Sequence, residues 1–446
     1  MSSNYFFIEC GNEYGLPQNK IWLAYAPLNG ASFLVTETEK NSLQEECSSG
    51  KNTEKLSIGA RALLRAPTRP IMRIPKSWDD VYEIDILLNF KCNFHCVYCY
   101  SAAGRSDTEL QWQTVKPLLD YLFSDKHPAR QPYRINFSGG GEPLLSFPLI
   151  RQITLAIEEK AIQSGHKFQL AMVTNGSLLT QEIIDFVSEH KIRLVVSFEI
   201  LEKFQNLERG QYDKVARNID LLLDNRANFG IRATLTAESA AAMPQMVQEL
   251  HERFPRLKAV TFDTVLSADL FQTPDELKNY HEIFFANLQA AKEMGKKYGI
   301  KIGDPYYLLL SFQRERTCLG KLVLTPEGKF STCSRISAPQ EKLFNNFIYG
   351  EIDPGGEIQL NQEKFSKIMS ENTISQPDCC NCFARWNCGG GCRLFALSFV
   401  KKEFLTVFCD FQKMALKRML LDKIENDFYA KNGKTLQETI KNMIFE

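Results

Sequence analysis

The sequence has no excess of charge of either sign and no long apolar run. Lys plus Arg and Asp plus Glu number 53 each in 446 residues, so the formal net charge is +0. A neutral chain gives no electrostatic reason to expect nucleic acid or an anionic membrane as a partner. No apolar stretch approaches the ~18 residues that suggest a membrane span. We therefore expect a protein that binds neither nucleic acid nor membrane.

Targeting and repetitive segments are also missing. The first residues, MSSNYFFIECGNEYG, lack the basic segment followed by an apolar segment that marks a secretion signal. The chain has no internal repeat, heptad array or low-complexity tract. These absences predict a cytoplasmic globular protein, and a length of 446 residues suggests two or three domains.

Cysteine, in contrast, is abundant, with 13 residues. Most fall into two clusters along the chain, and three stand apart: Cys10, Cys47 and Cys380. A disulfide framework belongs to small secreted chains, whereas this chain is large and has no secretion signal. Two alternatives are open at this point. Paired C-x2-C motifs form closed zinc sites, and thiolates at such spacings also bind iron–sulfur clusters.

Residues 1–80 are expected to form a small separate module. Short strands are predicted at 21–27 and 31–36, on either side of the turn-forming LNG. A polar segment follows, and the Pro-containing stretch RAPTRPIMRIP is interpreted as a linker.

From residue 82 onward, predicted strands and amphipathic helices alternate. The strand candidates are 83–90, 134–138, 168–174, 193–198, 230–236 and 258–265. The clearest helices between them are 181–190, 212–228 and 274–297. This order predicts parallel strands with right-handed crossovers. Because a complete eight-unit barrel needs about 250 residues, we expect an α/β fold with a partial (β/α)6 TIM-like barrel at 81–310. Residues 311–446 are expected to be an irregular domain that ends in an amphipathic helix.

The first cysteine cluster, in KCNFHCVYCY, lies on the loop that leaves the first predicted strand. Cys92, Cys96 and Cys99 thus lie at the end of the barrel where reactive loops gather. A closed zinc site would leave no vacancy for chemistry, whereas three thiolates on a 4Fe–4S cluster leave one iron open. The pattern C-x3-C-x-aromatic-C resembles the signature of radical S-adenosylmethionine (SAM) enzymes. The resemblance implies that SAM chelates the open iron and is cleaved to a 5′-deoxyadenosyl radical, which abstracts hydrogen from a C–H bond.

The loop after the second strand strengthens this resemblance. In FSGGGEPLL, Gly140, Gly141 and Glu142 match the GGEP motif of the family, which implies a contact with the SAM amino group. Missing side chains let the backbone approach a ligand closely. Tyr98, before the last cysteine of the triplet, is by the same resemblance placed near the adenine.

Three later residues are also predicted to contact SAM. Asn175 lies in the TNG that ends the third strand, where relatives often carry the same tripeptide. Ser197 ends the fourth strand and by resemblance touches the SAM ribose or carboxylate. Arg209 is a candidate for a charge-assisted contact to that carboxylate, with a solvated surface arginine as the alternative. Glu199, where relatives often have Asp, is given no role.

The second cluster begins with CLGKLVLTPEGKFSTC, in which a turn at 326–328 predicts a hairpin that brings its end cysteines together. The remaining cysteines follow as C-x2-C-x5-C-x3-C and one more. The whole pattern resembles the seven-cysteine SPASM extension of radical SAM enzymes, which implies two auxiliary 4Fe–4S clusters and three clusters in all. The implied ligands of the inner auxiliary cluster are Cys318, Cys333 and Cys392, and those of the outer one are Cys379, Cys382, Cys388 and Cys409.

One ligand of the inner cluster is not accounted for. Members of the family with eight cysteines have a further ligand six residues before the hairpin, where this chain has Phe312. We expect either an open iron position or a fourth ligand from Cys10, Cys47 or a carboxylate. Cys380 is expected to be a small buried residue.

The resemblance also implies a substrate class, because SPASM enzymes mostly modify peptides or proteins. Residues 1–80 resemble a leader-binding module, which predicts a maturase that installs a thioether or carbon–carbon crosslink in a ribosomally made peptide. A flavodoxin or ferredoxin would supply electrons.

Other reactions are weighed against this one. Anaerobic sulfatase-maturating enzymes, which oxidise a Cys or Ser side chain, usually have Asp where this chain has Ser334. Peptide epimerisation would need a hydrogen-donating thiol, for which there is no clear candidate. A non-catalytic electron carrier would not need the GGEP motif.

Overall fold

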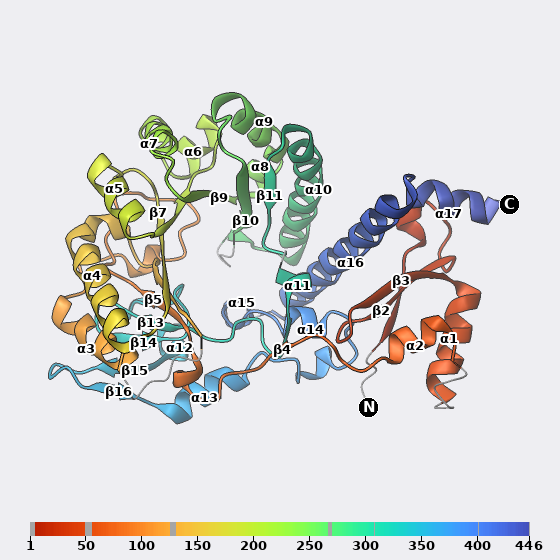
Figure 1. The fold of residues 1–446 in the computed structure, drawn as a ribbon, viewed down its shortest axis with the longest axis horizontal. Helices are drawn as coiled ribbons and strands as arrows, with labels where there is room; N and C mark the ends of the chain where they lie inside the picture. The colour runs from red at the N-terminus through yellow and green to blue at the C-terminus, as the bar shows by residue number, and fades with distance from the viewer. Residues whose placement is uncertain are drawn as a thin grey trace.

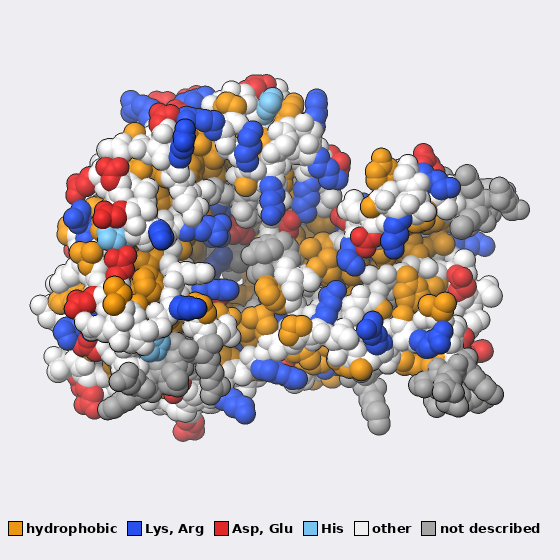
Figure 2. All heavy atoms as spheres, in the orientation of Figure 1, with side chains coloured by type: hydrophobic (Ala, Val, Ile, Leu, Met, Phe, Trp, Pro, Cys, Tyr) orange, Lys and Arg blue, Asp and Glu red, His pale blue; other side chains and the backbone are white. Residues whose placement is uncertain are grey.

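The main body of the protein is one large open sheet. The computed structural model describes residues 5–49, 56–124, 131–265, 270–306, 308–399 and 401–445. Within these residues an 11-stranded sheet has the order β11-β10-β9-β8-β7-β6-β5-β13-β14-β15-β16. Figure 1 shows its parallel strands with helices on their outer side. Basic and acidic side chains are intermixed over these helices (Figure 2), as a neutral chain would have them.

Seven parallel strands form the barrel part of the sheet. They are β5 (Glu83–Ile86), β6 (Tyr133–Phe137), β7 (Phe168–Thr174), β8 (Arg193–Ser197), β9 (Phe229–Leu235), β10 (Ala259–Thr264) and β11 (Lys301–Gly303). The six predicted strands are confirmed, and β11 is an additional one. The helices that accompany them are α3 (Trp112–Leu122), α4 (Phe147–Ser164), α5 (Gln181–Glu189), α6 (Glu202–Glu208), α7 (Tyr212–Asp224), α8 (Ala237–Ala240), α9 (Met243–Arg253) and α10 (Pro274–Tyr298).

Burial alternates along these strands and separates the two faces of the sheet. In β6, Ile135 and Phe137 are 0% exposed, whereas Asn136 between them is partly exposed. Successive side chains of a strand point to opposite faces, so one face packs against the helices and the other lines the concave side. The sheet does not close on itself, because β5 pairs on its other side with β13. The predicted partial barrel is thus confirmed.

The C-terminal region continues the sheet with antiparallel strands. These are β13 (Leu322–Leu324), β14 (Lys329–Ser331), β15 (Ile348–Ile352) and β16 (Ile358–Leu360). β13 and β14 form the predicted hairpin, and β13 runs parallel to β5. The helices of this region are α11 (Leu308–Ser311), α12 (Phe344–Phe347), α13 (Gln362–Ser370), α14 (Arg385–Cys388), α15 (Arg393–Ser398), α16 (Lys402–Asn432) and α17 (Leu436–Phe445).

The N-terminal module is a three-stranded antiparallel sheet with two helices. β2 (Ile21–Ala26) and β3 (Ala31–Thr36) are the predicted strands, and β1 (Phe6–Glu9) pairs with β2. The polar segment after β3 is helical as α1 (Glu37–Ser49), and α2 (Ile58–Leu64) follows. Thr36 and Glu39 cap α1 reciprocally, with Thr36 N donating to Glu39 Oε2 at 2.7 Å and Glu39 N donating to Thr36 Oγ1 at 3.3 Å. The predicted linker carries β4 (Ile71–Met72), which pairs with β12 (Gln313–Arg314).

This module packs against the C-terminal region. Buried Tyr25 donates its hydroxyl hydrogen to Asn387 Oδ1 at 2.9 Å, and Tyr14 donates to Glu425 Oε1 on α16 at 3.3 Å. Figure 1 shows α16 running from the cysteine-rich region to the N-terminal sheet. The expected boundary near residue 80 stays a prediction. In the described ranges, no helix has both the length and the apolar character needed to cross a membrane.

Candidate metal centre

Three thiols gather on the loop after β5. Cys92, Cys96 and Cys99 lie beyond the carboxyl end of that strand, and all are free cysteines. Burial raises the pKa of the Cys96 thiol; the Arg209 guanidinium opposes this effect, and the charges of Cys99 and Cys92 add to it. The three thiols are therefore close enough to influence one another electrostatically. A bound metal would hold such thiols deprotonated despite their burial.

The glycines of the GGEP motif hold the loop after β6 against the cysteine loop. Gly141 N donates to Asn89 O at 2.9 Å, and Glu142 N donates to Lys91 O at 2.7 Å. A Cβ atom on Gly141 would lie 1.8 Å from Lys91 O, and one on Gly140 would lie 2.6 Å from Asn89 O. The missing side chains therefore allow a close approach to backbone, in addition to any approach to a ligand.

The Glu142 carboxylate joins the ends of β6 and β7. It is 3% exposed, its Oε1 accepts hydrogen bonds from Thr174 Oγ1 at 2.6 Å and Leu144 N at 3.1 Å, and its Oε2 accepts from Asn175 N at 2.8 Å. Burial raises the pKa of Glu142, and these hydrogen bonds oppose the rise. Asn175 in turn donates from Nδ2 to Asn93 Oδ1 on the cysteine loop at 2.9 Å. Both predicted residues therefore lie next to the loop that carries the thiols, and their contact with SAM stays a prediction.

A second polar network lies at the ends of β8 and α6. Tyr98 donates its hydroxyl hydrogen to Glu199 Oε1, and Arg209 Nη1 donates to the Tyr98 oxygen at 2.9 Å. Arg209 Nη1 also lies 3.5 Å from Glu199 Oε1, with side-chain exposures of 9% and 0%. Burial raises the pKa of Glu199 to about 8, although Arg209 and Tyr98 oppose it. Arg209 is therefore not a solvated surface residue, and Glu199 is a site residue that the sequence analysis missed. Because Glu199 lies two residues after Ser197, which ends β8, its position near a strand end could have identified it as a site residue.

Two buried atoms of this network have no hydrogen bond within the described ranges: Glu199 Oε2 and Arg209 Nε. The backbone of Thr234 also lowers the pKa of the Glu199 carboxyl. Buried polar groups are normally paired, so this acceptor and this donor fit a ligand that carries both complementary groups. The amino and carboxylate groups of SAM have that character. Ser197 is partly exposed at the end of β8.

The second set of thiols contains the three sulfurs expected for the inner cluster. Burial raises the pKa of the Cys333 thiol to about 12. A hydrogen bond with the Arg335 backbone opposes this rise, and the charges of Cys318 and Cys392 increase it. The hairpin β13–β14 brings Cys318 and Cys333 together as predicted. Cys392 reaches them from the residue before α15.

The four cysteines expected for the outer cluster also gather. Burial raises the pKa of Cys388 to about 12, and the charges of Cys409, Cys379 and Cys382 add to the rise. Cys388 ends α14, and Cys409 lies on α16. Cys380 was expected to be buried, and this prediction is wrong. It is exposed, because it lies on a surface turn where its Sγ donates to Gln376 O at 3.6 Å.

Two cysteines considered as a fourth inner ligand have other neighbours. Cys10 is 0% exposed and donates from Sγ to Ile8 O at 3.3 Å. Burial raises its pKa to about 12, and the nearby charges are those of Lys417 and Glu13. Cys47 lies on α1, where burial and Glu46 raise its pKa. Neither is brought to the inner set in this structure.

In the part of the chain that the structure describes, no group of three or more His, Cys, Asp or Glu side chains is arranged to hold a single metal ion. A 4Fe–4S cluster does not require such convergence, because each thiolate binds a different iron atom.

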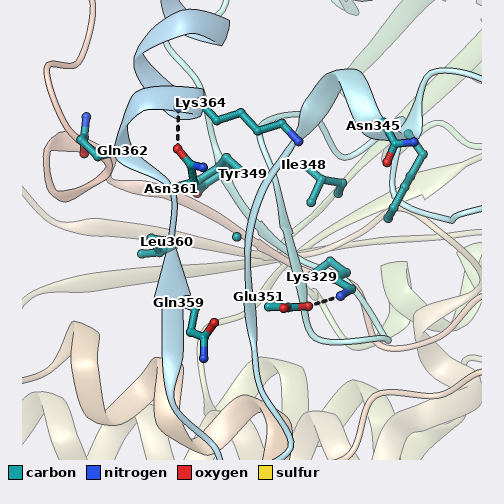
Figure 3. A pocket seen from close by; sticks show the side chains of 12 residues that line it. Lys329, Asn345, Ile348, Tyr349, Glu351, Gln359, Leu360, Asn361, Gln362 and Lys364 are labelled. Atoms are coloured by element: carbon teal, nitrogen blue, oxygen red, sulfur yellow. Dashed lines mark hydrogen bonds and ion pairs between the residues drawn. The ribbon is translucent and has the colours of Figure 1, made fainter.

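A surface groove of about 710 Å³ lies elsewhere, over β14–β16 and the start of α13. Figure 3 shows the Lys329–Glu351 ion pair among the lining residues and Asn361 at the start of α13, where its Oδ1 accepts from Lys364 N at 2.8 Å. None of the cysteines lines this groove, so it is not part of the thiol sites.

Comparisons with known proteins agree with this geometry. Residues 86–250 match the sequence profile of the Radical SAM superfamily. The chain is 21% identical over 355 residues to the serine-type anaerobic sulfatase-maturating enzyme of Klebsiella aerogenes, covering 74% of this chain and 84% of that protein. It is 19% identical over 404 residues to the radical SAM cyclopropyl synthase TigE of Paramaledivibacter caminithermalis, covering 81% and 78%. It is also 26% identical over 191 residues to an uncharacterized protein of Methanocaldococcus jannaschii, of which it spans 63%.

Solved structures share the fold. Native anSMEcpe with bound AdoMet superposes with a TM-score of 0.60 at 16% identity, covering 77% of this chain and 99% of that one. Its complex with AdoMet and a Kp18Cys peptide gives a TM-score of 0.59.

Proposed function

We propose that this chain crosslinks a ribosomally made precursor peptide. Residues 86–250 match the Radical SAM superfamily, and the sheet continues beyond them into a region that resembles SPASM domains. The observation that carries the proposal is the grouping of ten cysteines into sets of three, three and four, which the electrostatic neighbours of Cys96, Cys333 and Cys388 support. Such sets suit one open cluster, one cluster short of a ligand, and one closed cluster.

In this proposal the first set holds the cluster that binds SAM. With both bound, the site supplies a 5′-deoxyadenosyl radical, which abstracts hydrogen from the substrate. The protein orients SAM through the Arg209–Glu199 network and through Glu142 at the end of β6. Tyr98 lies beside the adenine, and the buried strand ends exclude water from the reacting atoms.

The remaining proposed SAM contacts are at the ends of successive strands: Gly140, Gly141, Asn175 and Ser197. The two auxiliary clusters are proposed to bind the inner set, Cys318, Cys333 and Cys392, and the outer set, Cys379, Cys382, Cys388 and Cys409.

A peptide substrate is supported by the named relatives and by the N-terminal sheet. One solved structure of the same fold contains a peptide, and another relative is a cyclopropyl synthase. In the β1-β2-β3 sheet, β1 and β3 are both edge strands. An extended leader would add to such an edge through backbone hydrogen bonds. We propose that 1–80 binds the leader, that 81–310 performs the chemistry, that 311–446 holds the auxiliary clusters, and that a cytoplasmic flavodoxin or ferredoxin is the reductant.

The test is to incubate the anaerobically reconstituted protein with SAM, a reductant and the short peptides encoded beside its gene. A crosslink removes two hydrogen atoms from the peptide and creates no aldehyde. One hydrogen atom would go to the 5′-deoxyadenosyl radical, and the other would leave as a proton while an auxiliary cluster accepts the electron. Mass spectrometry showing that loss, with no reaction toward a hydrazide probe, would support the proposal. Failure to modify any of these peptides would contradict it.

Oxidation of a Cys or Ser side chain is a second candidate, supported by the match to 84% of the serine-type anaerobic sulfatase-maturating enzyme. Its product is an aldehyde, which the same hydrazide probe captures. Capture by the probe would establish this reaction in place of crosslinking.

A further inference from the structure

Arg105 contacts the first set of thiols directly. It follows the short 3-10 helix η4 (Ala102–Gly104), and its Nη2 donates to Cys99 Sγ at 3.2 Å. Its Nη1 donates to Phe94 O, within the cysteine loop, at 3.3 Å. The guanidinium group therefore joins the sulfur of one cysteine to the backbone that carries the other two.

We propose that Arg105 is a positioning residue that raises the reduction potential of the cluster on Cys92, Cys96 and Cys99. The inference rests on the proposed function, which places the cluster there. Reduction adds one negative charge to the cluster, and a cationic N–H donor on a ligand sulfur stabilises the reduced state more than the oxidised state. Hydrogen bonds to ligands are a recognised means by which proteins adjust cluster potentials.

The residue before Arg105, Gly104, packs against a segment that follows the inner thiol Cys333 in sequence. A Cβ atom on Gly104 would lie 2.5 Å from Ala338 Cβ and 3.2 Å from Glu341 Oε1. The segment that carries Ala338 is itself fixed, because Glu341 Oε2 accepts from Ser337 N at 2.6 Å and from Ala338 N at 3.0 Å. This segment follows Cys333 closely in sequence. The residue before Arg105 therefore packs against a segment that begins near the inner thiols.

A second contact joins the same two regions. The Arg335 guanidinium carbon lies 5.3 Å from the centre of the Tyr100 ring. Tyr100 directly follows Cys99, and Arg335 lies two residues after Cys333. The segment just after Cys99 is therefore packed at two places against residues that follow Cys333: Tyr100 against Arg335, and Gly104 against Ala338.

A purely structural role for Arg105, as a brace on Phe94 O, predicts a different result from a role at the sulfur. A brace would change the stability of the loop and leave the potential of an intact cluster unchanged. The informative readout is therefore the potential, measured independently of catalysis.

The experiment is a redox titration of the reconstituted full chain, followed by electron paramagnetic resonance. The signal that changes on addition of SAM identifies the first cluster. In R105Q, we expect the ratio of reduced to oxidised cluster at a fixed solution potential to fall about tenfold, which is about 59 mV for a one-electron couple. R105K keeps the charge without the planar fork and should show a smaller fall. R217Q, which removes an exposed arginine on α7, should match the wild type.

A second pair of variants tests the packing contact. G104A should lower the potential as R105Q does, because its new methyl group collides with Ala338, and the double variant G104A/A338G should recover it. Potentials equal to wild type in R105Q, R105K and G104A, with full iron content, would overturn the inference. If R105Q loses its cluster, R105K and G104A decide the matter by the same criterion. A wild type without any SAM-sensitive iron–sulfur signal would reject the proposed function itself, and the inference with it.

Discussion

The polar residues beside the first thiols are buried and depend on one another. Glu199 is 0% exposed, and the Arg209 guanidinium and the shared Tyr98 hydroxyl oppose the rise that burial causes in its pKa. Such a network is costly to disrupt on one side only, because the remaining partner is left unpaired away from water. The residues that we propose for SAM binding therefore also stabilise the fold, and an experiment has to separate the two roles.

Paired substitutions separate them. R209Q should lower the free energy of unfolding by about 2 kcal/mol, because it removes a charge-assisted hydrogen bond from buried groups. The double variant E199Q/R209Q should regain most of that stability as a neutral amide pair. Both variants should bind SAM at least about tenfold more weakly, a loss of about 1.4 kcal/mol. Urea unfolding and equilibrium dialysis measure the two quantities. Wild-type SAM affinity in the double variant would refute the proposed contact.

Gly141 offers a test of the cysteine loop that leaves every proposed cluster ligand in place. In G141A the new Cβ would lie 1.8 Å from Lys91 O and 2.3 Å from Asn89 Oδ1, so the loop that carries the first cysteines must move. We expect the reconstituted variant to lose the iron of one cluster and to retain the rest. G230A is the control, because nothing lies within 4 Å of its Cβ position. Full iron content in G141A would show that the close packing is not needed.

The residue groupings followed largely from the sequence. Spacing and resemblance predicted which cysteines gather, because loops at strand ends and a hairpin bring them together. The partnership of Glu199 with Arg209 was not predicted, because it depends on a contact between two loops. The exposure of Cys380 was also missed, since a single cysteine in a turn carries no pattern that reveals which side faces water.

Among the elements, α10 and α16 meet at a buried histidine. His281 is 3% exposed, and its ring stacks on Phe411 of α16 with centroids 4.3 Å apart. Burial lowers the pKa of His281 to about 4. Because the unfolded chain takes up a proton near pH 6.5 and the folded chain only near pH 4, the titration of His281 does not change the free energy of unfolding above pH 6.5. As the pH falls from 6.5 toward 4, it lowers that free energy progressively.

A substitution isolates this effect. As the pH falls from 7 to 5, the free energy of unfolding of the wild type should drop by about 2 kcal/mol because of His281. The variant H281L should not show this drop. Urea unfolding of both proteins at the two pH values gives the difference. Equal losses in the two proteins would show that the pKa of His281 in the folded state is not lowered.

The contact between the N-terminal sheet and α14 is a further element-scale test. Y25F removes the hydrogen bond to Asn387 Oδ1, 2.9 Å long in the wild type, and leaves a buried acceptor with one donor fewer. We expect a loss of about 1 to 2 kcal/mol in unfolding free energy. Because Asn387 precedes Cys388, iron should also be released sooner on partial unfolding. A stability within error of the wild type would show that the contact contributes little.

The elements themselves were predicted unevenly. The six long barrel strands were clear from alternating apolar strands and amphipathic helices. Short strands such as β4, β11 and β12, of two or three residues, are too brief to give a pattern. The pairing of β13 with β5 was not predicted either, because it joins segments far apart in the chain and no local pattern encodes such a contact.

For the whole molecule, the structure changes the expectation for the N-terminal module. The sequence suggested a separate unit behind a linker. Its Tyr14 and Tyr25 side chains are instead 1% exposed, and each donates a hydrogen bond to the C-terminal region. Deleting 1–80 would therefore expose core as well as remove the proposed leader site. Point substitutions on the edge strands are the better way to test leader binding.

The central claim is that Cys92, Cys96 and Cys99 hold a cluster that cleaves SAM. The most direct measurement compares iron content and 5′-deoxyadenosine formation in the anaerobically reconstituted wild type and in the triple variant C92A/C96A/C99A. With three 4Fe–4S clusters proposed, the wild type should hold about twelve irons. The triple variant should hold about four fewer and form no 5′-deoxyadenosine, because the two auxiliary sets remain. A triple variant that still cleaves SAM, or a wild type that binds stoichiometric zinc and no iron, would contradict the claim.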